Sequence, residues 1–97
     1  MAYKILPYSF RKAKALRVEI KPSSNVLKKI DVFKNGKKVA SIGARGMKDY
    51  PTYLEKEKKG YYDKGYANKR RELYKERHEK DRHVVGSAGY DADKILW

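Results

Sequence analysis

The segment Ile30-Asp31-Val32-Phe33-Lys34-Asn35-Gly36-Lys37-Lys38-Val39-Ala40-Ser41-Ile42-Gly43 decides the fold. Asn-Gly between two segments rich in β-branched residues predicts a two-residue type I′ turn, because both central residues of that turn need a positive φ. Ile30 and Val32 alternate onto one face of the expected hairpin, while two registers stay open for the second strand. We therefore predict an antiparallel hairpin over residues 29–44.

Segments with helix and strand signals flank this hairpin. Before it, Ser9 is expected to cap a helix over residues 10–16, and the polar–apolar alternation of residues 17–21 predicts a short strand. After it, Pro51 suits the first turn of a helix over residues 52–58, and a densely charged helix is expected from about residue 63 or 66 to residue 80.

The end of the sequence predicts a core anchor. Asp91 is expected to cap a final helical turn that ends in Ile95-Leu96-Trp97, and this large apolar group should dock on the hairpin. Together these elements predict a single domain over residues 1–97 of the α+β class. In it a small antiparallel hairpin or sheet packs against two to four short helices.

Positive charge is concentrated in the first half of the chain. The 97 residues hold 25 Lys and Arg against 12 Asp and Glu, a formal net charge of +13. Counted by position, residues 1–48 carry +11 and residues 49–97 carry +2. Such a field favours polyanionic partners, with nucleic acid first and an anionic membrane surface or an acidic protein second.

Composition excludes several other classes. The chain has no cysteine, which rules out disulfides and cysteine-ligated metal centres. No apolar run approaches the roughly 18–20 residues that span a bilayer. Basic residues interrupt every apolar stretch of residues 1–20, so we expect no signal peptide and no secretion.

Motifs for catalysis and metal binding are missing. His78 and His83 are five residues apart, which places them about 140° apart on a helix, so they cannot share a metal. No cysteine nucleophile or Gly-x-Ser-x-Gly motif is present, and Gly43-Ala44-Arg45-Gly46 lacks the Lys-Ser/Thr of a phosphate-binding P-loop. We therefore expect no catalytic residues, no metal and no cofactor, although Arg45 could reach a backbone phosphate.

Basic clusters give the candidate interface. Lysine outnumbers arginine, which suits phosphate contacts more than bidentate base recognition. The candidate contacts are Arg11, Lys12, Lys14, Lys28, Lys29, Lys37, Lys38 and Arg45, followed by Lys69, Arg70 and Arg71. A two-stranded ribbon also fits the DNA major groove in width, and part of the hairpin lysine content is equally explained as protection of an exposed strand edge.

The nine tyrosines have two explanations. Exposed tyrosines between lysines could stack on unpaired bases, whereas others fill the rim of a small core. We assign Tyr50, Tyr53, Tyr74 and Tyr90 to the core rim. For Tyr61 and Tyr62, which lie beside lysines, both explanations stay open.

The order of several short motifs resembles a family of small basic proteins of large eukaryotic DNA viruses of the phycodnavirus and mimivirus type. The similarity covers about residues 29–97 and is carried by Gly36-Lys37-Lys38-Val39, Ile42-Gly43, Asp49-Tyr50, Tyr74-x-x-Arg77-His78 and the closing segment with Leu96-Trp97. This chain departs from the pattern at Ser41-Ile42, has Tyr53 where relatives tend to have His, and carries extra residues around 60–67. The resemblance implies a virion or infected-cell setting, in nucleus or cytoplasm, but no mechanism.

Two functions follow from these observations. The first is a non-enzymatic nucleic-acid-binding protein of a large DNA virus, directed to phosphates with low sequence specificity and to DNA more than RNA. The alternative is a structural virion protein, a minor capsid or cement component that binds acidic capsid surfaces. The sequence leaves the oligomeric state open.

Overall fold

Three antiparallel strands and four helices make up a computed structural model of the chain, which describes residues 3–97. Their order and bounds are α1 Pro7–Leu16, β1 Glu19–Pro22, β2 Lys28–Lys34, β3 Lys37–Ala44, α2 Tyr50–Lys58, α3 Tyr66–Arg77 and α4 Ala88–Leu96. The predicted α+β class is confirmed. None of the helices within the described range combines the length and apolar character needed to cross a lipid bilayer.

The predicted hairpin forms the centre of the sheet. Asn35 and Gly36 adopt φ values of 53° and 78°, as a type I′ turn requires, and β2 lies between β1 and β3. Opposite each other, Ile30 pairs with Ile42 and Val32 with Ala40, so these residues share the inner face. A bulge beside Val32 then leaves Val39 exposed and resolves the register that the sequence left open.

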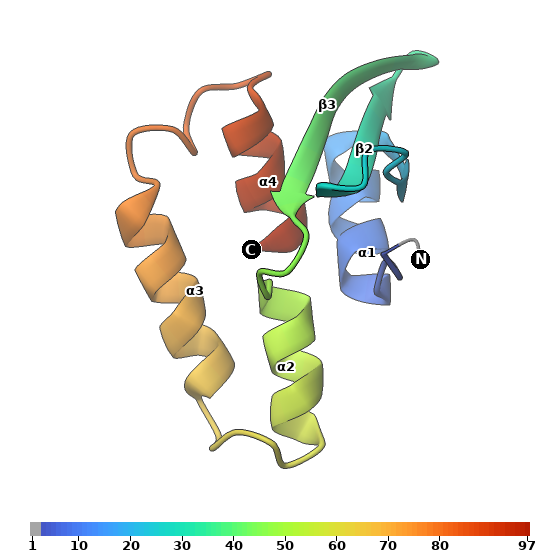
Figure 1. Cartoon of the computed structure of the whole chain (residues 1–97). Coiled ribbons are helices and arrows are strands. Elements are labelled where there is room, and N and C mark those ends of the chain that lie inside the picture. The colour runs from blue at the N-terminus through green and yellow to red at the C-terminus, as the bar shows by residue number, and fades with distance from the viewer. Residues whose placement is uncertain (1–2) are drawn as a thin grey trace.

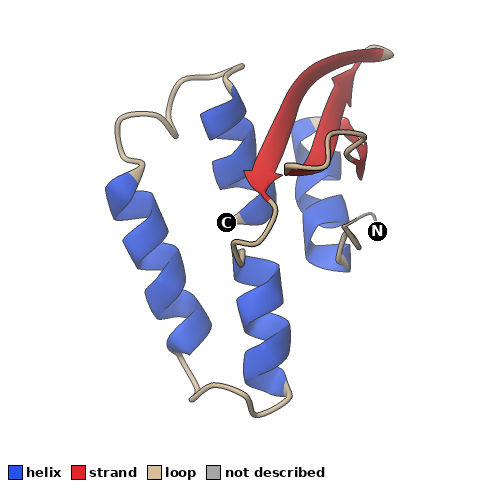
Figure 2. Ribbon diagram, viewed as in Figure 1, coloured by secondary structure: helices blue, strands red, loops and turns tan. Residues whose placement is uncertain are grey.

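Helices α1 and α4 cover the inner face of the sheet, and α2 and α3 form a helical hairpin that extends beyond it (Figure 1). Figure 2 shows that all strands lie together at one side of this arrangement. The hydrophobic core lies between the sheet and α4. It contains Ile95 and Leu96 of α4 and, from the sheet, Ile20, Ile30, Val32 and Ile42.

Two predicted caps are wrong. Ser9 lies inside α1, which begins at Pro7, and its buried hydroxyl donates to the carbonyl of Ile95 at 3.0 Å. Helix α4 begins three residues before Asp91 and is capped by Ser87, whose Oγ accepts from the Tyr90 amide at 3.1 Å. The hydroxyl of Ser9 is therefore used in a tertiary contact, whereas Ser87 caps α4 through a local hydrogen bond that was not predicted.

Other boundaries differ by a few residues. The first strand begins at Glu19 rather than at residue 17, because Arg17 takes a left-handed conformation (φ 60°) as it ends α1. Helix α2 begins at Tyr50, and Asp49 caps it by accepting from the Thr52 amide at 3.0 Å. Helix α3 ends at Arg77, three residues short of the prediction.

The predicted apolar anchor docks as expected, with one difference in its partners. Leu96 lies against the hairpin so closely that a Cβ added to Gly43 would come within 2.8 Å of its Cδ1. Trp97, however, stacks on Tyr74 of α3, with ring centroids 4.2 Å apart and planes 5° from parallel. The end of α4 therefore ties the sheet to the helical hairpin.

Candidate nucleic-acid interface

The residues predicted to contact nucleic acid differ widely in exposure. Exposed are Arg11, Lys14, Lys37, Lys38, Arg45 and Lys69, half-buried are Lys12, Lys28, Arg70 and Arg71, and Lys29 is buried.

Lys29 does not belong to a contact surface. Its ammonium is 2.9 Å from Oδ2 of Asp49, and both side chains are almost wholly buried. The same carboxylate accepts from the Tyr3 hydroxyl at 2.7 Å, and Lys29 also lies 5.3 Å from the centroid of the Tyr3 ring. The prediction of Lys29 as a phosphate contact is corrected for this reason: its charge is used inside the molecule, where it joins β2 to the start of α2.

The other hairpin cations divide between its two ends. Lys37 and Lys38 lie at the turn, whereas Lys28 pairs with Ala44 at the opposite end, next to Arg45. Six residues of strand separate the two ends by about 20 Å. In addition, Lys38 lies 3.8 Å from the carboxylate of Asp31. The hairpin therefore does not offer its cations as one compact group.

Cations from three helices converge on the side where α1, α3 and α4 meet. We define this basic cluster by Lys12 of α1, Arg71 and Lys75 of α3, and Lys94 of α4. Burial, followed by the positive charges of Arg71, Lys75 and Lys94, lowers the pKa of Lys12 below its ordinary value. These three cations are therefore close enough to Lys12 to oppose its positive charge.

One buried carboxylate holds the basic cluster together. Asp93 of α4 is 1% exposed, and its oxygens lie 2.8 Å from Lys75 and 3.7 Å from Lys94. Arg82, from the loop after α3, lies 3.8 Å away and also binds Glu79. A single carboxylate facing this many cations leaves an excess of positive charge on that side of the molecule.

Arg71 is held in place by an aromatic neighbour. Its guanidinium lies 5.0 Å from the centroid of the Tyr50 ring, and Tyr50 in turn makes an edge-to-face contact with Tyr8. The Nε atom of Arg71 is buried and has no hydrogen-bond partner among the residues that the structure describes. The guanidinium is thus positioned by its contact with Tyr50, while its buried Nε is left without an acceptor.

Lys12 and Arg71 were predicted as contacts from the sequence, whereas Lys75 and Lys94 were not. Lys75 lies four residues after Arg71, on the same face of a helix, so the spacing could have shown it. Lys94 had no such signal, because only the packing of α4 against α1 and β3 brings it to this side.

The remaining site residues of interest do not form a metal centre or a shared stack. His78 stacks on Tyr74 with centroids 4.2 Å apart, whereas His83 lies 2.8 Å from Glu79. Within residues 3–97, no group of three His, Cys, Asp or Glu side chains is placed to hold a metal ion.

The four tyrosines assigned to the core rim are all at least half-buried. Tyr50 and Tyr53 are buried, and Tyr74 and Tyr90 are half-buried.

The open pair of tyrosines separates. Tyr62 stacks on Tyr66 at 4.4 Å and belongs to the packed helical hairpin. Tyr61 is 72% exposed, with the Lys56 ammonium 5.8 Å from its ring centroid.

Comparison of the chain with models of protein families, with curated proteins and with solved structures found no match. The site is therefore interpreted from its own geometry, and the viral resemblance stays a prediction.

Proposed function

We propose that the protein is a non-enzymatic nucleic-acid-binding protein that contacts phosphates through the basic cluster. The supporting observation is that Lys75 and Lys94 pair with one buried carboxylate, Asp93, and lie near Lys12 together with Arg71. A phosphate placed among these groups offsets their positive charges and accepts hydrogen bonds from ammonium and guanidinium groups.

One exposed cation of α1 extends this surface. Arg11 is adjacent to Lys12 on the helix and is exposed, so it can contact a phosphate backbone that leaves the cluster, whereas Lys14 lies about 160° from Lys12 round the helix and faces another side. Lysine point charges and stacked arginines recognise phosphate without reading bases, which favours binding of low sequence specificity. DNA is the partner we expect first, in keeping with the setting that the sequence resemblance implies.

Fluorescence anisotropy with labelled 20-nucleotide duplex DNA, single-stranded DNA and RNA, each at two salt concentrations, tests this proposal. We expect the logarithm of the binding constant to fall with the logarithm of salt by about 0.7–0.9 per phosphate contacted. The double variant Lys12→Gln/Lys94→Gln should lower that slope by about two and weaken all sequences equally.

The matched control is Lys64→Gln/Lys80→Gln, two exposed loop lysines outside the cluster that carry the same total charge. Control and wild type should bind alike. Equal loss in both double variants would mean that only net charge matters, and absence of binding at low salt would overturn the proposal. The alternative of a virion protein would then be favoured if the protein bound an acidic polypeptide but no oligonucleotide.

A further inference from the structure

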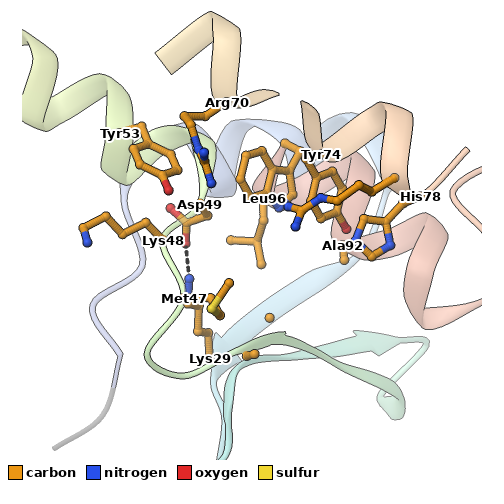
Figure 3. A pocket seen from close by; sticks show the side chains of 14 residues that line it. Lys29, Met47, Lys48, Asp49, Tyr53, Arg70, Tyr74, His78, Ala92 and Leu96 are labelled. Atoms are coloured by element: carbon orange, nitrogen blue, oxygen red, sulfur yellow. Dashed lines mark hydrogen bonds and ion pairs between the residues drawn. The ribbon is translucent and has the colours of Figure 1, made fainter. Parts of the chain in front are cut away.

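A second group of cations lines a pocket on the other side of α3. The pocket has a volume of about 260 Å³ and lies between the end of β3, the segment that leads into α2, and the helices α3 and α4 (Figure 3). Its volume falls just below the roughly 300–1,000 Å³ of pockets for drug-sized ligands, so it suits a single small ligand.

One face of α3 forms the cationic wall of this pocket. Arg70, Tyr74, Arg77 and His78 follow the spacing of a single helix face, and all four line the pocket. The guanidinium of Arg70 lies 5.6 Å from the centroid of the Tyr53 ring, and its Nε is buried without a hydrogen-bond partner in the described part of the chain. Adjacent arginines of α3 thus serve different sides: Arg71 the basic cluster, and Arg70 the pocket.

The one carboxylate in the pocket lining is already neutralised. Asp49 accepts from Lys29 at 2.9 Å, from Tyr3 at 2.7 Å and from the Thr52 amide at 3.0 Å (Figure 3 shows the ion pair). An anion in the pocket therefore faces the positive charges of α3 with little opposing charge.

The floor of the pocket is apolar and aromatic. Leu96 and the Cβ-free Gly43 lie side by side there, and Trp97 stacks on Tyr74 with ring centroids 4.2 Å apart. An inorganic anion makes no favourable contact with such a surface, whereas a flat aromatic ring is stabilised by packing against it.

We propose that this pocket binds one nucleoside monophosphate unit, with the base on the apolar floor and the phosphate at Arg77 and His78. The guanidinium of Arg70, on the same wall of the pocket, is then a further donor to the bound unit. If the protein binds nucleic acid as proposed above, the bound unit is the phosphorylated end of a strand, and this part of the proposal rests on that function. A free nucleotide has the same chemistry and is the other source.

Isothermal titration calorimetry and the indole N–H resonance of Trp97, the single tryptophan, test the site directly. The probes are adenosine and guanosine 5′-monophosphates, ribose 5-phosphate, and the nucleosides without phosphate. We expect each nucleotide to shift the indole resonance and to bind at least about tenfold more tightly than either of its parts. Equal affinity of ribose 5-phosphate would show a plain anion site, equal affinity of a nucleoside would show an apolar site, and either result overturns the inference.

Variants separate this site from the basic cluster. Arg77→Gln should weaken nucleotide binding by about tenfold, whereas Arg17→Gln, at an exposed arginine that belongs to neither site, should leave it unchanged. Ala44→Phe fills the pocket from the exposed end of β3 and should abolish binding while the thermal transition shows that the protein is folded. If neither pocket variant alters nucleotide affinity, the nucleotide binds elsewhere and the inference fails.

Oligonucleotides identify the source of the unit. Recognition of a strand end is supported if a 5′-phosphorylated strand shifts the Trp97 resonance at a lower concentration than a free nucleotide or a 5′-hydroxyl strand does. The reverse order supports a free nucleotide as the ligand. Lys12→Gln/Lys94→Gln should leave binding of free nucleotides unchanged. Failure of nucleotides to bind, with intact salt-dependent DNA binding, removes the pocket proposal and leaves the proposed function standing.

Discussion

The two halves of the chain differ in formal charge by +11 against +2, yet the nearly balanced half contributes most to both places where cations converge. The reason is the position of the acids. Asp49, Asp91 and Asp93 of the second half are buried, and Glu55 and Glu79 are engaged by neighbouring cations. The charge of Lys29, in the first half, is in turn paired with Asp49 in the interior. Net charge per segment therefore does not measure the field at the surface, which depends on where the carboxylates lie.

The largest expected effect comes from breaking the ion pair that joins the halves. Asp49→Ala removes the partner of a buried ammonium, the acceptor of the Tyr3 hydroxyl and the cap of α2. Because an unpaired charge is then left in the core, we expect a loss of about 3–5 kcal/mol in the free energy of unfolding, measured by urea titration.

Two further variants check the cause of that loss. Lys29→Met removes the charge but leaves Asp49 with its other two donors, so it should cost less than Asp49→Ala. The double variant should be more stable than Asp49→Ala alone, because no ammonium is left unpaired. A loss below about 1 kcal/mol for Asp49→Ala would show that the halves are not held together by this pair.

The next effect concerns the close contact between the hairpin and α4. Gly43→Ala places a methyl 2.8 Å from Leu96 and 3.0 Å from Lys29 at a φ of +77°, so strain and overlap together should cost about 2–4 kcal/mol. Gly60→Ala is the matched control: its φ is +86°, but open space surrounds it, so only the backbone strain of about 1–2 kcal/mol should appear. Equal thermal transitions for the two variants would contradict a tight contact at Gly43.

Local signals explain what could be predicted. Asn35-Gly36 fixed the hairpin because its turn chemistry acts over two residues, and the α+β class followed from the segments around it. The cap at Ser9 failed because its hydroxyl finds the carbonyl of Ile95, 86 positions away, which no local pattern contains. The same holds for Lys29, whose burial depends on Asp49.

The candidate site shows the same limit. Lys12 and Arg71 were identified from charge runs, but the runs gave no reason to separate Arg70 from Arg71, which lie on different sides of α3. Lys94 was missed because its neighbours come from other helices. Residues that share one helix face can therefore be predicted from their spacing, whereas the convergence of side chains from different helices depends on tertiary packing.

The smallest expected effect compares a buried acid from each half during acidification. Burial tends to raise the pKa of Asp31, but hydrogen bonds from Ser23, Ser41 and the Ser24 amide outweigh it and hold that pKa below its ordinary value of 3.8. For Asp91, burial dominates and raises the pKa, with Lys34 opposing. The two carboxylates therefore respond to acid with opposite signs.

As the pH falls below about 4, Asp31 becomes protonated in the unfolded chain at a higher pH than in the folded protein. The stabilisation of the folded protein by ionised Asp31 is therefore lost. Asp91 instead takes up its proton first in the folded protein, which gains stability on acidification. Asp31→Asn should therefore reduce, and Asp91→Asn should enlarge, the loss of unfolding free energy between pH 6 and pH 2.5, each by about 1 kcal/mol or less. Urea titrations at a series of pH values measure both, and a change of the same sign in the two variants would contradict the contrast between the sheet and the helical half.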